Sequence, residues 1–533
     1  MKKLLVANRG EIALRIFRAC GEEGIATVAV VTPDDAGSLH ARSADATIEI
    51  PSYLDAAEHV RAAHESGADA VHPGYGFLAE SAELAEAVLA AGLTWVGPPP
   101  AALRAGGDKL AAKETARAAG VPILPSGEPE LLGFPLLVKA AAGGGGRGMR
   151  VVRSEDELDD AIDAARREAL AAFGDDTVFF ERYLERPRHV EIQLLADAHG
   201  TVVSLGEREC SIQRRHQKVL EESPVLDETL RAHMSDAAIA FARAIGYVSA
   251  GTAEFVLDGA EFFFLELNAR IQVEHPVTEL VTGVDLVREQ LRIADGAHLD
   301  LQPELVGHAV EVRLYAEDPH TFLPQAGRIE RLRLPAGVRV DAGVEEGDEI
   351  GTSYDPMIAK LVAHGATRGD ALDRLATALD ETEVAGVTTN LPFLRWLVAH
   401  PAVRDGRTTT AFLTEHPPLS PVPVRRTAPA WRGAWRLNVA PPPPRPSPTV
   451  DDGALEHAAA GELSAVTAPM PGTVLKVLVE PGARVNARQP LVVLEAMKME
   501  TPLVSPYDAT VRAVHVSEGD RVAGGSLLIE LEE

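Results

Sequence analysis

The C-terminal part of the chain repeats itself, and this repeat constrains the fold more than any other feature of the sequence. Residues 469–485 and 506–522 match at an offset of 37 residues in Pro469 and Pro506, Thr473-Val474 and Thr510-Val511, Val477 and Val514, Gly482 and Gly519, and Arg484-Val485 and Arg521-Val522. Each half alternates apolar and polar residues and contains a glycine turn, at 481–482 and at 519–520. One half alone cannot bury an apolar face, so the two halves are expected to close into a small, two-fold, all-β sandwich.

Lys498 lies at the junction between the two halves. A hairpin is expected there, and its tip would expose the lysine side chain to water. Lys498 follows the apolar run 491–494, precedes the run 501–504, and has a methionine on either side. An isolated Met-Lys-Met is an ordinary solvated turn about as often as a site of covalent modification. Within this repeat, however, Ala468-Pro-Met-Pro-Gly472 and Ala496-Met-Lys-Met499 resemble the biotin carboxyl carrier domain, whose central lysine is joined to biotin by an amide bond. A lipoyl carrier domain usually has Asp before its lysine and lacks the paired methionines, so the resemblance favours biotin.

The charge balance and the cysteine count bear on the class of protein. With 51 basic and 79 acidic residues the net charge is −28, which does not predict a nucleic-acid-binding surface. An anionic substrate would need a local basic pocket, because the overall field repels it. The two cysteines, Cys20 and Cys210, provide no disulfide framework, as is typical of the cytoplasm. The first residues lack the pattern of a signal peptide, and no apolar run approaches the roughly 20 residues that would span a membrane.

Strand and helix signals alternate along the first part of the chain. Apolar runs at 4–7 and 27–31 flank an amphipathic stretch at 11–21, which is the βαβ pattern of a parallel sheet. No Gly-x-Gly-x-x-Gly motif follows the first run, so a dinucleotide site is not predicted there. A second βαβ-like block is expected from about Phe134 to Ala196. At 533 residues the chain has room for about three or four domains.

A lysine and a run of glycines form a candidate phosphate-binding site. Lys139 ends the apolar strand 134–139, and Gly143-Gly-Gly-Gly-Arg-Gly148 follows it. Consecutive glycines let backbone N–H groups turn toward a polyphosphate without obstruction by Cβ, and the lysine adds a point charge. A glycine run alone is more often a flexible turn, but the strand-end lysine before it favours a nucleotide loop. Lys109, just ahead of a helix expected at 111–119, is a second candidate cation.

Acidic residues on a predicted β-hairpin form a candidate metal site. The segment 251–268 is expected to be a hairpin with a tight turn near 258–259. Glu266 and Asn268 project from one face of its second strand, and Glu254 lies roughly opposite on the first strand. Carboxylates facing inward on such an apolar hairpin would be costly without a cation, and their oxygens suit Mg²⁺ that bridges nucleotide phosphates.

The next segment, 268–276, alternates polar groups with the period of a strand. Arg270 can hold a planar oxyanion through two parallel hydrogen bonds, and Glu274, beyond Gln272, is placed to accept a proton from it. These residues predict a pocket for a small planar acid such as bicarbonate. The cationic stretch 208–218 is expected to contribute to the same pocket. The alternative, a solvated or nucleic-acid-binding basic patch, is disfavoured because the chain as a whole is so acidic.

From Met1 to about His416 the sequence resembles the biotin carboxylase component of biotin-dependent carboxylases, which are ATP-grasp enzymes. Together with the carrier-like segment, the resemblance covers nearly all of the chain except a Pro-rich connector. The motifs that carry it are Ala7-Asn-Arg-Gly-Glu-Ile-Ala13, His72-Pro-Gly-Tyr-Gly-Phe-Leu78, Lys139 with the glycine run, 181–191, Arg214-Arg-His-Gln-Lys218, 268–276 and Tyr354-Asp-Pro-Met-Ile-Ala-Lys360.

The resemblance implies a role for each candidate residue. Glu274 would be the base that activates bicarbonate, and Arg313 would stabilise biotin as its ureido nitrogen loses a proton, with Tyr75 in the segment bordering biotin. The implied catalytic set is Glu274, Arg270, Arg313 and Lys218, and the implied bicarbonate site is Lys218, Arg270, Gln272, Val273 and Glu274. The implied ligands of Mg²⁺, or of Mn²⁺ in its place, are Glu254, Glu266 and Asn268. The residues implied to contact ATP are Lys109, Lys139, Gly143, Gly144, Gly145, Gly146, Glu181, Leu184, His189, Gln213, His216 and Glu254.

The expected fold class is α/β, with a βαβ domain and an ATP-grasp domain, followed by an α+β region and a small all-β sandwich of the biotinyl/lipoyl type. The Pro-rich connector is expected to be extended, so that the carrier can visit separate sites. The expected boundaries are 1–112 for the N-terminal domain, 113–325 for the ATP-grasp domain with a lid at about 134–205, 326–416 for the C-terminal domain, 417–463 for the linker and 464–533 for the carrier.

The resemblance implies a ligase that carboxylates biotin on Lys498 with ATP and bicarbonate, as the first half-reaction of an acetyl- or propionyl-CoA carboxylase. The chain has no space for a carboxyltransferase, so a separate β subunit is expected, together with a biotin protein ligase and a homo-oligomer within a larger hetero-oligomer. Neither nucleic acid nor membrane is an expected partner, and the expected location is cytoplasmic. Two alternatives are the biotin carboxylase half of a pyruvate or urea carboxylase, and a carrier protein whose ATP-grasp block catalyses another ligation.

Overall fold

The computed structural model describes two compact units of the chain. One unit comprises Met1–His320, Gly327–Glu349 and Met357–Leu419, and the other comprises Thr321–Ala326, Ile350–Pro356 and Ser420–Glu533. Most of the predicted linker lies outside the described residues. The described residues are 1–140, 149–173, 175–214, 217–420, 465–470, 472–496, 499–522 and 525–532, without the side chains of 109, 168, 171–173, 496 and 499–501.

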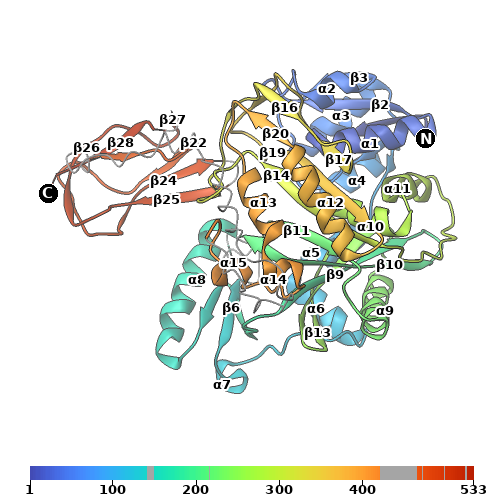
Figure 1. Cartoon of the computed structure of the whole chain (residues 1–533), viewed down its shortest axis with the longest axis horizontal. Helices are drawn as coiled ribbons and strands as arrows, with labels where there is room; N and C mark the ends of the chain where they lie inside the picture. The colour runs from blue at the N-terminus through green and yellow to red at the C-terminus, as the bar shows by residue number, and fades with distance from the viewer. Residues whose placement is uncertain are drawn as a thin grey trace, which may run out of the picture. The chain divides into compact units, whose positions relative to one another are not determined.

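The first unit begins with a five-stranded parallel sheet and its connecting helices (Figure 1). The elements are β1 (Lys3–Val6), α1 (Gly10–Glu23), β2 (Ala26–Val31), α2 (Leu39–Ser43), β3 (Ala46–Glu49), α3 (Ala56–Ser66), β4 (Ala70–His72), α4 (Ala82–Ala90) and β5 (Thr94–Trp95). The strand order is β3-β2-β1-β4-β5, and every pair is parallel. Successive residues of β1 are fully buried, so both faces of the sheet are covered. The predicted βαβ start is confirmed.

An eight-stranded antiparallel sheet forms the centre of the same unit. Its strands are β9 (Arg188–Ala196), β10 (Val202–Arg214), β11 (Gln217–Ser223), β12 (Ser249–Asp258), β13 (Glu261–Asn268), β14 (His308–Tyr315), β17 (Arg339–Ala342) and β19 (Met357–Gly365). They lie in the order β13-β12-β9-β10-β11-β14-β19-β17. The helices packed against them are α9 (Glu228–Ala244), α10 (His275–Thr282), α11 (Leu286–Ala294) and α12 (Arg368–Glu381). The sheet therefore continues across the domain boundary predicted at 325.

A smaller three-stranded sheet holds the strand that precedes the glycine run. The elements of this region are α5 (Pro100–Gly107), α6 (Lys109–Ala118), α7 (Pro129–Leu132), β6 (Leu136–Ala140), β7 (Arg150–Val152), α8 (Leu158–Phe173) and β8 (Val178–Arg182). Strand β6 pairs antiparallel with both β7 and β8, so the expected βαβ-like arrangement is wrong. The connection from β6 to β7 is too short for a parallel crossover. The lid predicted at about 134–205 also spans two sheets, because β9 belongs to the central one.

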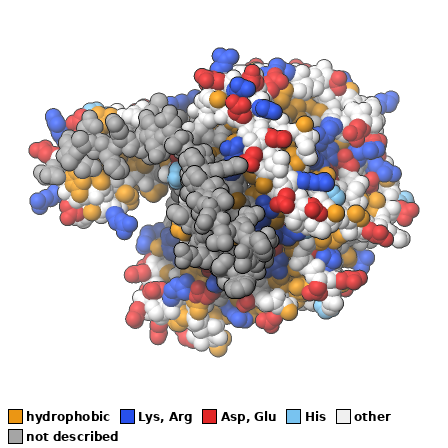
Figure 2. Space-filling model, viewed as in Figure 1, with side chains coloured by type: hydrophobic (Ala, Val, Ile, Leu, Met, Phe, Trp, Pro, Cys, Tyr) orange, Lys and Arg blue, Asp and Glu red, His pale blue; other side chains and the backbone are white. Residues whose placement is uncertain are grey.

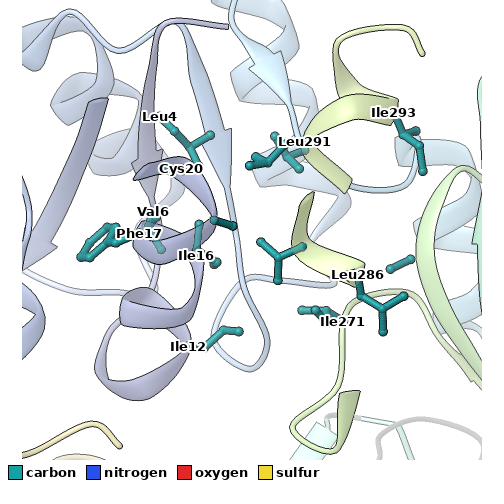
Figure 3. Close-up of a cluster of buried hydrophobic side chains, with 14 of the residues drawn as sticks. Leu4, Val6, Ile12, Ile16, Phe17, Cys20, Ile271, Leu286, Leu291 and Ile293 are labelled. Carbon is teal, nitrogen blue, oxygen red and sulfur yellow. The ribbon is translucent and has the colours of Figure 1, made fainter. Parts of the chain in front are cut away.

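Apolar packing connects the N-terminal sheet to the loop after β13. Leu4 of β1 and Ile16 of α1 pack in one buried cluster with Leu286 and Leu291 of α11 (Figure 3). Ile271, which is 0% exposed, belongs to the same cluster. Because Ile271 lies between two predicted bicarbonate-site residues, the cluster fixes the position of that loop.

The C-terminal part of the first unit mixes short strands and helices, as the predicted α+β region requires. Its remaining elements are β15 (Gly327–Arg328), β16 (Arg331–Arg333), β20 (Glu383–Ala385), α13 (Leu391–Ala399), α14 (Pro401–Arg404) and α15 (Phe412–Glu415), and β18 (Glu349–Ile350) lies at its boundary with the other unit. Ring contacts hold the last helices together: Trp396 of α13 lies 5.0 Å from His400 and 6.4 Å from Phe412 of α15, between ring centroids.

The C-terminal unit contains two four-stranded sheets that follow the sequence repeat. Its strands are β21 (Ala465–Thr467), β22 (Gly472–Val477), β23 (Arg484–Val485), β24 (Pro490–Ala496), β25 (Met499–Val504), β26 (Ala509–Val514), β27 (Arg521–Val522) and β28 (Leu527–Glu532). The sheets run β21-β28-β26-β23 and β25-β24-β22-β27 around one core, so each half contributes to both. Equivalent residues of the two halves, Val474 with Val511 and Leu494 with Leu531, are all buried. The two-fold all-β prediction is confirmed.

Side chains of both charges are interspersed over the visible surface (Figure 2). Some form exposed ion pairs, as Arg42 does with Glu345 at 2.6 Å. Within the described ranges, none of the helices combines the length and the apolar character needed to cross a bilayer.

Candidate active site

A cavity of about 730 Å³ is lined by residues of the central sheet and of the three-stranded sheet. This volume is typical of a site for a small molecule. The predicted residues that line it are Lys139, Leu184, His189, Gln213, Lys218, Glu254, Glu266, Asn268, Arg270, Gln272, Val273, Glu274 and Arg313. The fold therefore brings the candidate nucleotide, metal and bicarbonate residues to one place.

Other predicted residues lie elsewhere or are not described. Tyr75 is not among the lining residues, and its hydroxyl donates a hydrogen bond to Glu11 of α1. The predicted residues outside the described part are Gly143, Gly144, Gly145, Gly146, His216 and Lys498, together with the side chain of Lys109.

Glu181 was expected at the ATP site, and its side chain holds two lysines. It is fully buried and pairs with Lys113 and, at 2.6 Å, with Lys139. Lys113 lines the cavity and was missed by the sequence analysis. Its spacing of one helical turn from Lys109 was the signal available, because residues four apart share one face of a helix.

Lys218 is the centre of a network of buried charges in the cavity. Its amine contacts Glu254 at 2.8 Å, Glu274 at 2.7 Å and also Glu191. Burial lowers the pKa of Lys218, but these three carboxylates together raise it well above its usual value. Lys218 is therefore a permanent cation that an anion entering the cavity can share.

Glu274 lies between two cations. Its second oxygen is 3.0 Å from Nη2 of Arg313, which also reaches Glu221 at 2.5 Å. Burial alone would raise the pKa of Glu274, but Lys218 and Arg313 hold it well below its usual range. The carboxylate is therefore ionised, the form that a proton acceptor requires. An anion that shared one of these cations would raise this pKa and make Glu274 a stronger base.

The loop that carries Glu274 differs from the predicted strand. Strand β13 ends before it, residues 269–274 form a loop, and α10 follows with Glu274 at its N-cap. The strand expected over 268–276 is therefore wrong, although the side chains of Asn268, Arg270, Gln272 and Glu274 do line the cavity. Pro276 explains the difference, because proline is favoured in the first turn of a helix.

Arg208 and Glu191 hold this site together, although neither residue is assigned a role of its own from the sequence. Arg208 has no exposed surface and donates to Glu191 at 2.7 Å and to Gln272 at 2.8 Å. Glu191 lies opposite Arg208 in the pairing of β9 with β10, and opposite Glu254 in the pairing of β9 with β12. The quoted 181–191 motif contained Glu191, but its partners depend on strand register, which one sequence does not reveal.

The three candidate metal ligands meet on the β12–β13 hairpin. Glu254 lies opposite Glu266, and Asn268 donates to Glu254 at 2.8 Å. His189, Glu191 and Glu254 also bring ligand atoms within 4.8 Å of one another. Carboxylate and amide oxygens at a cavity fit Mg²⁺, which takes few protein ligands and binds together with substrate phosphates.

Two buried glutamates face each other behind Arg313. Glu221 of β11 is paired with Glu311 of β14, and neither has any exposed surface. Burial raises the pKa of Glu221 to about 7, although Arg313 opposes the rise. Burial likewise raises the pKa of Glu311 well above its usual value. The two carboxyl groups therefore resist ionising together.

Glu221→Gln is expected to stabilise the chain increasingly as the pH rises from 5 to 8. The carboxyl of Glu221 ionises near pH 4.3 in the unfolded chain but only at about pH 7 in the folded one, so stability is lost across this window. Glutamine does not ionise, so the variant avoids this loss in the free energy of unfolding, which is on the order of 2–3 kcal/mol between pH 5 and pH 8. The melting temperatures of both proteins across this pH range measure the effect. A constant difference between them would contradict the raised pKa.

Family models match nearly all of the chain outside the connector. They are, in order, the biotin carboxylase N-terminal domain at 1–103, the ATP binding domain of the carbamoyl-phosphate synthase L chain at 108–302, the biotin carboxylase C-terminal domain at 311–415, and a model described as biotin-requiring enzyme at 464–531.

Two curated proteins are similar over different lengths. The biotin-dependent acyl-coenzyme A carboxylase alpha3 subunit of Mycobacterium leprae is 40% identical over 592 residues, covering 99% of this chain and 98% of the relative. The mitochondrial methylcrotonoyl-CoA carboxylase subunit alpha of Oryza sativa is 47% identical over 445 residues, covering 78% of this chain. The chain spans only 60% of the length of the rice protein.

A solved structure is similar to the unit that contains the cavity. It is the biotin carboxylase domain dimer of the 2-oxoglutarate carboxylase of Hydrogenobacter thermophilus, in complex with MgADP, ADP and bicarbonate. The TM-score is 0.76 at 43% identity, covering 78% of this chain and 98% of that one. The chain therefore belongs to the family of biotin-dependent carboxylases, as a biotin carboxylase with an ATP-grasp fold followed by a biotin-type carrier domain.

Proposed function

We propose that the chain catalyses the first half-reaction of an acyl-CoA carboxylase of the acetyl- or propionyl-CoA type. In this reaction ATP and bicarbonate carboxylate the biotin on Lys498. The observation that carries the proposal is the position of Glu274, between Lys218 at 2.7 Å and Arg313 at 3.0 Å in one cavity with the candidate metal ligands.

Bicarbonate is activated by losing its proton to Glu274. Bicarbonate is a poor electrophile, so one of its oxygens must first be joined to a phosphoryl group. Lys218 and Arg270 hold the anion while Glu274 takes the proton, and the freed oxygen attacks the γ-phosphorus of ATP. The bond from the γ-phosphorus to ADP breaks in the same step.

Charge on the nucleotide is balanced by this chain's own residues. Lys139, held in place by Glu181, supplies a cation beside the phosphates. Glu254 and Glu266 would hold Mg²⁺ with Asn268, and the ion would supply positive charge against the charge that develops on the phosphoryl group. The three-stranded sheet with α8 is our candidate for a lid that excludes water from the reactive mixed anhydride.

The mixed anhydride of carbonate and phosphate then separates into CO₂ and phosphate. The phosphate takes the proton from the ureido nitrogen of biotin, and this nitrogen captures the CO₂. Arg313, placed beside Glu274, stabilises the negative charge that develops on the ureido oxygen.

Transfer of the carboxyl group to an acyl-CoA is assigned to a separate carboxyltransferase β subunit. The mycobacterial relative supports this choice, because it matches the chain over nearly its whole length and is named an acyl-CoA carboxylase subunit. A biotin protein ligase would attach the biotin. A homo-oligomer within the larger complex is supported by the solved biotin carboxylase domain, which is a dimer.

Two measurements test the proposal. The purified chain should release ADP only with bicarbonate, and free biotin should accelerate the release. Co-expressed with a candidate β subunit, it should then incorporate labelled bicarbonate into acetyl-CoA or propionyl-CoA. Label in pyruvate or urea would point to the alternative carboxylases, and ADP release independent of bicarbonate would point to a different ligation.

A further inference from the structure

The loop that carries Glu274 is held from behind by a fully buried lysine. Lys360, on β19, has no exposed surface and donates a 2.9 Å hydrogen bond to the backbone carbonyl of Val273. Val273 directly precedes Glu274, so this bond fixes the peptide from which the Glu274 side chain projects. At the other end of the loop, Ile271 is fixed by the apolar cluster of Figure 3. The loop thus has an apolar anchor at Ile271 and a polar anchor at Val273.

Lys360 is paired with a carboxylate of the N-terminal domain. Its Nζ lies 3.1 Å from Glu11 Oε1, and Asp341 Oδ2 is 4.0 Å away. Glu11 is 4% exposed and also accepts the hydrogen bond of the Tyr75 hydroxyl. Burial raises the pKa of Glu11, while the charge of Lys360 opposes the rise. One buried carboxylate therefore joins the Tyr75 segment to the lysine behind the loop.

Stability alone does not account for this arrangement. Removing two charges from water costs about as much as their attraction returns, so an apolar pair of similar volume would stabilise the fold as well. The bond to the Val273 carbonyl requires a donor, which an apolar residue lacks. The contact therefore links Lys360 to Glu274.

We propose that Lys360 is a positioning residue for the carboxylation of biotin. With Glu11 it fixes the Val273–Glu274 peptide, so that the Glu274 carboxylate faces Lys218, and through Glu11 it ties this loop to Tyr75. The inference rests on the proposed role of Glu274 as the base. It adds that the bicarbonate loop and the segment bordering biotin are held by the same buried pair.

Lys360→Met tests the proposal, since methionine fills the space without donating a hydrogen bond. We expect kcat/KM for bicarbonate to fall by about tenfold or more, while KM for ATP changes by less than about twofold. The measurement is bicarbonate-dependent ADP release by the full chain, at saturating ATP and then at saturating bicarbonate. A purely structural lysine would change both parameters alike or neither.

Two further variants separate positioning from folding. The single variant leaves Glu11 buried without its cation, so the double variant Lys360→Met/Glu11→Gln removes both charges and is expected to keep the bicarbonate defect. Arg368→Met is the matched control, because Arg368 of α12 forms a 2.6 Å ion pair with buried Glu222 but does not line the cavity. It should lower the melting temperature and leave kcat/KM for bicarbonate unchanged.

Wild-type bicarbonate kinetics in a folded Lys360→Met or double variant would overturn the positioning role. An equal bicarbonate defect in Arg368→Met would overturn it too, because the effect would then reflect general destabilisation. If the wild-type chain itself releases no ADP in response to bicarbonate, the proposed function fails instead, and the two failures are thereby distinguished.

Discussion

Glu274→Gln is expected to lower kcat for bicarbonate-dependent ADP release by about 10²- to 10⁴-fold, the range that a general base contributes. Glutamine keeps the shape of the side chain and its place at the N-cap of α10, but its amide does not accept the proton of bicarbonate. Affinity for ATP should change by less than about twofold, because the variant removes chemistry rather than nucleotide contacts.

The variant should fold, because the cations around Glu274 keep other partners. Lys218 retains its contacts with Glu191 and Glu254, and Arg313 retains Glu221, whose ionised form is favoured once the charge of Glu274 is removed. No buried cation is therefore left uncompensated, which is the usual reason that breaking a buried pair destabilises a protein.

ADP release and nucleotide titration of the same preparations measure the two effects. Glu207→Gln is a suitable control, since Glu207 is a buried carboxylate that pairs with Arg231 and does not line the cavity. The control should affect stability and leave turnover intact. Near-wild-type turnover in Glu274→Gln, or loss of nucleotide binding, would contradict the role assigned to Glu274.

The parts of the site that follow local rules could be predicted from the sequence. A tight turn and apolar strands specify the β12–β13 hairpin, and strand geometry then places Glu254 opposite Glu266. The repeat likewise fixes the carrier sandwich, because each half needs the other to bury residues such as Val474 and Val511.

The remaining parts depend on contacts between distant segments. Glu191 reaches Lys218 only because β9 lies between β10 and β12, an order that no local pattern encodes. The polar alternation of 268–276 looked like a strand, whereas the helix signal from Pro276 determined the backbone. In the sequence, Lys360 is only the last residue of the 354–360 motif. Its contact with Val273 depends on the fold, which brings β19 behind the loop.

Lys498→Arg is expected to abolish carboxyl transfer to acyl-CoA completely, because an arginine guanidinium does not form the amide bond that joins biotin to the carrier. The same variant should carboxylate free biotin at the wild-type rate, since the cavity and the carrier belong to separate compact units. Streptavidin capture and intact mass after expression in biotin-replete cells report the modification. ADP release with free biotin reports the carboxylase.

Lys476→Arg is the matched control, as Lys476 is an exposed lysine on β22 of the same domain. It should be biotinylated and support transfer like the wild type. The strands on either side of Lys498 pair as far as Ala496 and Met499, so the substitution changes only the connection between them and should leave the sandwich folded. Retained capture of Lys498→Arg by streptavidin would place the attachment on another lysine. Loss of free-biotin activity would instead mean that the carboxylase requires the carrier for its own chemistry, because the substitution leaves every cavity residue unchanged.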